Sequence, residues 1–303
     1  MSDVYVHTTA LMSTVVTFQV VGHGDDDAAH RERVEIVGRA VEWFRSVEAC
    51  CSRFDETSEL RRLGESIGTP VAASEMLYAA VNFAIALAHD TNGAFDPTVG
   101  RRMEARGFNR NHRTGAAIES APSSEIGAGY RDVELDPSAK TITIRRPLTL
   151  DLGAVAKGLA IDLAARELAP FENFSIDAGG DLYLGGHNPA DAPWSVGIRH
   201  PRDATQLVET VQVSNEAVCT SGDYERRSDR DDREHHIMDP RTGASATELA
   251  SVTVIAPSAM VADALATAAF VLGPTDGIAL LQRHGVRGLL LTPALERYET
   301  HAA

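Results

Sequence analysis

One segment near the C-terminal end, PSAMVADALATAAFVLG (residues 257–273), restricts the possible folds more than any other. Its residues are apolar on nearly every face of a helix, so such a helix has to be surrounded by protein. It nevertheless contains Asp263 and Thr267, which lie one turn apart and project from the same face. Burying an unpaired charge is very costly, so Asp263 needs a partner. That partner is either a hard divalent cation or, alternatively, the N–H groups of a neighbouring loop, with Thr267 bonding back to the helix.

The rest of the chain predicts hairpin-connected strands and a few separate helices. This order favours an α+β fold, with a mixed, largely antiparallel sheet and packed helices, over a doubly wound sheet. No repeat or linker divides the sequence, and we expect a single domain over residues 1–303. The predicted helices cover residues 28–47, a short stretch from 57 or 58, 74–89, 154–168, 259–272 and 275–284. The predicted strands cover residues 10–21, 133–135, 141–144, 148–150, 174–177, 181–184, 194–198, 208–213, 217–220, 235–238, 251–255 and 288–292. Residues 100–130 predict a long irregular surface segment.

Composition limits the classes of partner. The formal net charge is −15, which disfavours nucleic-acid binding, so an anionic ligand would need a local device such as a helix N-terminus or a metal ion. The three cysteines, Cys50, Cys51 and Cys219, have no metal-binding spacing and are expected to be free thiols in a reducing compartment. Residues 1–21 lack a basic signal region, and no window is expected to approach a transmembrane span. We therefore expect a cytoplasmic protein without membrane insertion.

The segment LTLDLGAVAKGLAID (residues 148–162) predicts an apolar strand that ends at Asp151 and a helix that begins directly after Gly153. Free N–H groups at such a helix start suit a phosphate, and Lys157 in the first turn adds a positive charge. The spacing of a Walker loop is absent. Taken by itself, the pattern favours the alternative of an ordinary strand-to-helix turn with a solvent-facing lysine.

Three weaker motifs complete the set. GAFDPTVG (residues 93–100) combines a turn with Phe95, a flat face for an aromatic ring. The Gly179–Gly180 pair fits a two-residue hairpin turn. HHIMDPRTG (residues 235–243) places two adjacent histidines before a β-turn, and only one histidine of a strand pair can face a given site. A single histidine there is a candidate base.

The order of these motifs is more specific than any one of them. The blocks are Met12–Thr14, SRFDETSEL (52–60), GAFDPTVG (93–100), DLGAVAKG (151–158), DAGGDL (177–182), SGDYER (221–226), HHIMDPRTG (235–243) and ADALATA (262–268). Over nearly its whole length the chain resembles the ApbE family of FAD:protein FMN transferases. One departure is RRMEARGFNRNHRTG (residues 101–115), where Arg101, Arg102 and Arg106 either contact a ligand or partner or coat the surface. Another is Phe54, which stands where relatives often have Tyr or Trp.

The resemblance implies a site. It implies that Mg²⁺ is held by Asp263, Thr267 and the backbone carbonyl of Ala154, on the pyrophosphate of the substrate FAD. We expect Asp263 and His236 to be the catalytic residues, with His236 as the base for the acceptor threonine. The implied FAD contacts are Met12, Phe54, Ala94, Phe95, Asp96, Asp151, Lys157 and Met238.

The implied reaction is attack of a threonine hydroxyl of an acceptor protein on the FMN-side phosphorus of FAD, with release of AMP. Phosphoryl transfer asks mainly for positioning and charge neutralisation, which fits this set of residues. Two other functions fit the same pocket. One is a magnesium-dependent FAD pyrophosphatase in which water replaces threonine, and the other is a non-catalytic FAD-binding protein.

Overall fold

The structure is a computed structural model that describes residues 3–22, 24, 26–110, 115, 117–118, 127–226 and 234–300. Within these residues, eight strands form one sheet in which every neighbouring pair is antiparallel. In spatial order they are β1 (Val4–Leu11), β2 (Thr14–Val21), β6 (Asn173–Ala178), β7 (Asp181–Gly185), β10 (Glu216–Gly222), β11 (Ser251–Ala256), β12 (Arg287–Leu291) and β13 (Arg297–Glu299). The expected α+β class with a largely antiparallel sheet is confirmed.

Two smaller sheets accompany the large one. A three-stranded sheet has the order β3 (Val71–Ala72), β5 (Thr141–Ile144), β4 (Val133–Asp136), and a two-stranded ribbon consists of β8 (Trp194–His200) and β9 (Asp203–Val213). The helices are α1 (Asp27–Cys51), α2 (Glu59–Gly64), α3 (Glu75–Asp90), α4 (Gly100–Ala105), α5 (Gly153–Glu167) and α6 (Ala259–Arg283). Ser58, Ser74 and Ser258 cap α2, α3 and α6 by accepting a backbone N–H with their side chains.

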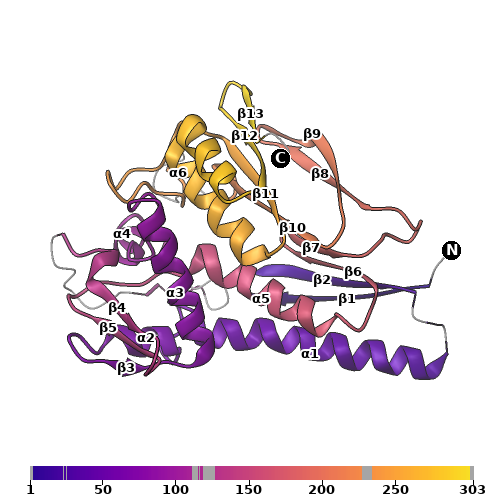
Figure 1. Cartoon of the computed structure of the whole chain (residues 1–303), viewed down its shortest axis with the longest axis horizontal. Helices are drawn as coiled ribbons and strands as arrows, with labels where there is room; N and C mark the ends of the chain where they lie inside the picture. The colour runs from indigo at the N-terminus through magenta and orange to yellow at the C-terminus, as the bar shows by residue number, and fades with distance from the viewer. Residues whose placement is uncertain are drawn as a thin grey trace.

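The large sheet lies between two layers (Figure 1). Helices α1, α5 and α6 cover one face and share the main apolar core with it, where Phe18 of β2 meets Phe44 of α1 edge to face at 5.8 Å. The β8–β9 ribbon packs on the other face, through apolar contacts with β7, β10, β11 and β12. Alternate residues of one strand therefore face the helices and the ribbon.

Helix α6 lies deep inside this arrangement, as its composition predicts. Gly273 has a non-helical φ of 79° and precedes Pro274, so the helix is broken where the sequence predicts an end. The expectation that no window approaches a transmembrane span is wrong for α6, whose length and mean hydropathy of 1.6 over 18 residues reach that range. Its burial against α5, β10, β11 and β12 accounts for this composition, because a core helix needs the same apolar faces.

Three predicted strands differ from the structure. Residues 10–21 form the end of β1, a tight turn and β2, because Met12 and Ser13 adopt positive φ angles of 48° and 64° and reverse the chain. Residues 148–150 form only an isolated bridge between Thr149 and Val99. Residues 235–238 form no strand either, with an isolated bridge between Met238 and Ser245. The prediction for residues 100–130 lies partly outside the described residues, and its described start is the short helix α4.

Helix α5 is fastened to the start of α6 by a side chain. The carboxylate of Asp162 accepts hydrogen bonds from the Ser258 hydroxyl at 2.6 Å and from the N–H groups of Ala259 and Met260 at 2.7 and 3.1 Å. These N–H groups belong to the first turn of α6 and have no partner within the helix. The contact fixes where the polar face of α6 lies relative to α5.

Candidate active site

A large cavity of about 1310 Å³ opens between the helical layer and the ends of β7 and β10. It extends past the start of β7, because β10 pairs with β7 only as far as Val218, and from there to Gly222 it pairs with β11 on its other side. All the residues that the sequence singles out for binding or catalysis line this cavity. They are Met12, Phe54, Ala94, Phe95, Asp96, Asp151, Ala154, Lys157, His236, Met238, Asp263 and Thr267.

Helix α6 presents Asp263 and Thr267 to the cavity from its buried face. Asp263 is 7% exposed, and its Oδ2 atom has no hydrogen-bond partner within the described residues. The Thr267 hydroxyl lies 3.1 Å from the hydroxyl of Ser221 at the end of β10. Burial and the neighbouring charge of Asp181 raise the pKa of Asp263 to about 7, against the opposing effects of Lys157 and Arg226. The alternative in which loop N–H groups satisfy Asp263 is therefore not what the structure shows.

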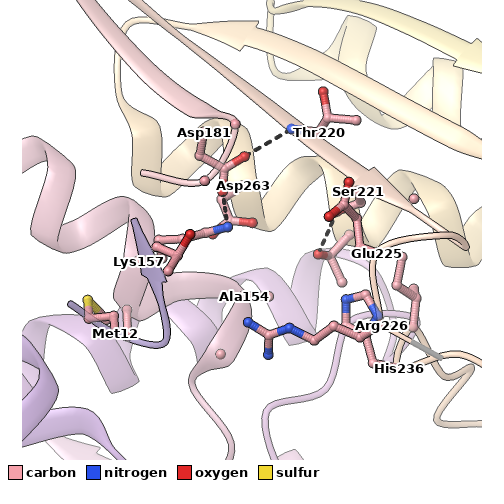
Figure 2. A pocket seen from close by; sticks show the side chains of 18 of the residues that line it. Met12, Ala154, Lys157, Asp181, Thr220, Ser221, Glu225, Arg226, His236 and Asp263 are labelled. Carbon is pink, nitrogen blue, oxygen red and sulfur yellow. Dashed lines mark hydrogen bonds and ion pairs between the residues drawn. The ribbon is translucent and has the colours of Figure 1, made fainter. Parts of the chain in front are cut away.

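The Lys157 side chain lies in the cavity rather than on the outer surface. Its ammonium forms an ion pair with Asp181, the first residue of β7, whose other carboxylate oxygen accepts the Thr220 N–H at 3.1 Å (Figure 2). Burial alone lowers the pKa of Lys157, but the charges of Asp181 and Asp263 outweigh burial and raise it, so the amine stays protonated. The first-turn position of α5 thus directs this side chain into the cavity.

The floor of the cavity therefore holds two carboxylates, Asp181 and Asp263. When both are ionised, Lys157 pairs with Asp181, and Oδ2 of Asp263 stays without a hydrogen-bond partner in the described part of the chain. A divalent cation with oxygen ligands would complete this arrangement. No group of three or more His, Cys, Asp or Glu side chains suited to a metal occurs within the described residues, so hydroxyl, carbonyl and ligand oxygens would supply the remaining coordination. The orphaned Asp263 oxygen and the Thr267 hydroxyl fit a hard cation.

The start of α5 forms one wall. The Asp151 carboxylate accepts the Gly153 N–H at 2.8 Å and pairs with the guanidinium of Arg53 at 2.7 Å. The Arg53 guanidinium in turn lies over the ring of Phe54, 4.1 Å from its centroid. Asp151 thus orders the backbone before Ala154 and joins it to the segment that carries Phe54.

The loop after α3 forms a second wall. Asp96 accepts hydrogen bonds from the backbone and hydroxyl of Thr98 at 2.8 and 2.6 Å, and burial raises the pKa of its carboxyl. Ala94 and Phe95 are 1% and 6% exposed and belong to the main core. Little of the Phe95 ring is therefore left for contact with a ligand.

The two adjacent histidines have different surroundings. The His235 ring is buried edge to face against Phe270, bonds to the Ala246 carbonyl through Nε2 at 2.8 Å, and accepts the Ile237 N–H at 3.3 Å. His236 instead lines the cavity, and burial together with the charge of Arg226 lowers its pKa to about 3. His236 is thus a neutral imidazole. The rings of His235 and His236 face different surroundings even though residues 235–238 form no strand.

Arg102 and Arg106 of the α4 region hold the turn that follows these histidines. Arg102 donates to the carbonyl of Pro240, and Arg106 donates to the carbonyl of Gly243 at 3.0 Å and to the hydroxyl of Ser245 at 2.9 Å. Neither of them lines the cavity. Their role within the described structure is to fasten the segment that carries His236 and Met238.

Comparison with known proteins agrees with this architecture. The model of the ApbE family matches residues 12–290. This chain belongs to the ApbE family. A FAD:protein FMN transferase of Vibrio cholerae is 30% identical over 262 residues, which cover 83% of this chain and 78% of that protein, and one of Treponema pallidum is 33% identical over 259 residues, which cover 78% and 72%. The crystal structure of an ApbE protein from Thermotoga maritima superposes with a TM-score of 0.85 at 30% identity, over 99% of this chain and 97% of that one. The flavin transferase ApbE of Vibrio cholerae superposes with a TM-score of 0.83 at 26% identity, over 100% and 98%.

Within this ApbE chain, the charged residues of the cavity to which the sequence analysis assigns no role include Arg53, Asp181 and Arg226. Asp181 follows the Gly179–Gly180 turn, whose φ angles of 68° and 95° confirm the predicted hairpin. A residue directly after such a turn faces a predictable side of the sheet, and this is the signal that could have identified Asp181. For Arg53 and Arg226 the sequence holds no such signal, because nothing local predicts which way their long side chains extend.

Proposed function

We propose that this protein transfers FMN from FAD to a threonine hydroxyl of an acceptor protein, with Mg²⁺ held by Asp263, Thr267 and the Ala154 carbonyl. The observation that carries the proposal is the orphaned Asp263 oxygen, buried in the same cavity as every residue that the family resemblance selects. The relatives named FAD:protein FMN transferase support the reaction class. The metal and the threonine go beyond what those names state.

The fit of the proposed substrate rests on size and charge. Pockets for drug-sized ligands occupy roughly 300–1000 Å³, and this cavity exceeds them, which suits a dinucleotide. When bound, magnesium would neutralise the diphosphate and polarise its phosphorus–oxygen bonds. Lys157, already paired with Asp181, then acts mainly to keep both aspartates near the metal. It is less suited to binding phosphate by itself.

His236 is the proposed base. Its Nδ1 atom is buried without a partner in the described part of the chain, which leaves Nε2 as the nitrogen open to the cavity. A neutral ring with its proton on Nδ1 accepts the hydroxyl proton at Nε2 as the oxygen attacks phosphorus. The bond to the bridging oxygen breaks, and AMP leaves with the electron pair. The low pKa of His236 rises when an anionic diphosphate lies nearby, which brings the ring closer to the range of an effective base.

Mass spectrometry of both products tests the proposal. The protein is incubated with FAD, Mg²⁺ and a threonine-bearing candidate acceptor, with the Thr→Val acceptor as the control. Transfer predicts an acceptor heavier by one FMN residue and one equivalent of AMP, and no gain on the Thr→Val acceptor. AMP together with free FMN would instead identify a pyrophosphatase, and the absence of both products would indicate a binding protein.

A cytoplasmic location is also proposed, because the three cysteines are buried free thiols.

A further inference from the structure

The positively charged side chains of the cavity are not equivalent. Three of them form ion pairs within the protein: Arg53 with Asp151, Lys157 with Asp181, and Arg199 with Glu225. Arg110 donates to the Gly115 carbonyl at 3.2 Å. Arg226 also lines the cavity, and in the described part of the chain its guanidinium has no hydrogen-bonding or ionic partner. An Arg side chain has five N–H donors and is always charged, so an unpaired one is available to an anion.

The position of Arg226 is set by His236. The His236 N–H donates to the Arg226 carbonyl at 3.1 Å, which ties the two backbones together. The Arg226 side chain then extends across the cavity, and its guanidinium points toward Ala154 at the start of α5 (Figure 2). Its positive charge acts on two groups of the site. It lowers the pKa of His236, and it opposes the rise in the pKa of Asp263 that burial causes.

We propose that Arg226 is a further catalytic residue, whose guanidinium binds the non-bridging oxygens of the FMN-side phosphate of FAD during transfer. This inference rests on the proposed function and adds to it a residue that faces the reacting phosphorus. In Figure 2 the Arg226 side chain runs from beside the proposed base, His236, toward Ala154, one of the proposed metal ligands. The space between these two groups is where a diphosphate would lie if both act on it.

The proposed reaction would be faster with a cation beside the reacting phosphate. As the acceptor oxygen bonds to phosphorus and the bond to the bridging oxygen breaks, negative charge lies on the non-bridging oxygens and on the departing AMP. The hydroxyl proton goes to His236, and AMP leaves with the electron pair. Planar guanidinium donors match two phosphate oxygens at once, which an ammonium cannot do. Lys157 is not an equivalent donor, because Asp181 already holds it.

The test compares Arg226→Ala and Arg226→Lys with the parent protein and with Arg202→Ala. Arg202 is a suitable control because it is paired with Asp223 at 2.6 Å and does not line the cavity. Two quantities are measured for each protein: the FAD dissociation constant by equilibrium fluorescence titration, and kcat for FMN transfer with Mg²⁺. We expect Arg226→Ala to lower kcat by about 10²–10³-fold, as loss of a donor to a developing charge does. We expect it to weaken FAD binding by about tenfold, the effect of losing one hydrogen bond to a charged group.

Arg226→Lys should retain the charge but lose the paired donors, so its kcat should fall between those of the parent and Arg226→Ala. Added guanidinium ion should partly restore the kcat of Arg226→Ala. Arg202→Ala should behave as the parent. Parental kcat and parental FAD affinity in Arg226→Ala overturn the inference. Unaltered kcat with weaker FAD binding also overturns the catalytic role, and leaves only a ground-state contact. Failure of the parent protein itself to bind FAD or to transfer FMN is a different result, because it rejects the proposed function before any variant is compared.

Discussion

Gly158 of α5 lies directly against the backbone of Ala259 at the start of α6. A Cβ atom on Gly158 would stand 2.5 Å from the Ala259 carbonyl oxygen and 2.5 Å from the Cα atom of Met260. Only glycine allows this approach, because neither contact can be relieved by a side-chain rotation. The contact brings Lys157, the preceding residue, and Asp263, one turn into α6, to the same part of the cavity.

Gly158→Ala is therefore expected to push the two helices apart. We expect the free energy of unfolding to fall by about 1–3 kcal/mol through overpacking. Gly38→Ala is the matched control, since Gly38 lies on the exposed side of α1 and its added methyl would meet nothing within 4 Å. That change should stabilise the protein by about 0.5–1 kcal/mol through helix propensity. Urea denaturation of both variants measures the difference, and equal effects of one sign would refute the close contact.

Asp263→Asn should remove the magnesium dependence together with most of the transfer. The amide keeps the shape of the side chain but lacks the charge that a hard cation requires, so the metal affinity should fall. The unfolding free energy at pH 8 without metal should not fall, because burial and the charge of Asp181 disfavour the Asp263 carboxylate more than Lys157 and Arg226 favour it, and a neutral group replaces it. Asp276→Asn, on an exposed part of the same helix, is the control and should titrate with magnesium as the parent does. A parental magnesium titration in Asp263→Asn would place the metal elsewhere.

The two adjacent histidines should respond differently to truncation. His236→Ala is expected to slow transfer by about 10²–10⁴-fold with little change in FAD affinity or stability, because it removes a base whose buried Nδ1 has no hydrogen bond within the described residues. His235→Ala should instead lower stability by about 1–3 kcal/mol, since the Ala246 carbonyl and the Ile237 N–H both lose their partner. His187→Ala, outside the cavity, controls for the loss of an imidazole. Kinetic and denaturation measurements on the three variants separate a base from a structural residue, and His236→Ala at the parental rate would exclude it as the base.

The sequence predicts the elements of this fold well where their pattern is local. The period of α1, the serine caps of α2 and α3, and the double glycine between β6 and β7 all specify their own structure. The hairpin turn at Met12 and Ser13 escapes prediction because neither residue favours a positive φ, and the surrounding β-branched residues are typical of one continuous strand. Tertiary pairing with β6 fixes the register of β2 there, and no local signal expresses it.

The residues of the site likewise differ in whether local sequence predicts them. Asp263 is predictable because a charge on an otherwise apolar helix violates a local rule, and such violations mark functional positions. Asp181 and Arg226 obey local rules, and they become important only because β7, β10 and α6 meet at one cavity. The sequence also leaves Arg102 and Arg106 as candidate ligand contacts, because it does not show where their side chains extend. In the folded chain both donate to carbonyls of the 239–243 turn.

Acid denaturation offers a last test, because it reports on His236 without substrate. Burial lowers its pKa from 6.5 to about 3, so between these values the unfolded chain binds a proton that the folded protein does not. The stability associated with neutral His236 is therefore complete above pH 6.5 and is lost as the pH falls toward 3. The slope is about 1.4 kcal/mol for each pH unit in that window.

The measurement compares the unfolding free energy of the parent with that of His236→Gln at pH 7, 6, 5 and 4.5, in the absence of metal. The parent should lose stability relative to the variant as the pH falls, because glutamine takes up no proton in either state. Asp263 titrates in the opposite sense near pH 7, since burial raises its pKa, but it is present in both proteins and cancels in the difference. Parallel profiles for the two proteins would show that the His236 ring is solvated, and the cavity would then be open where the structure closes it around Nδ1.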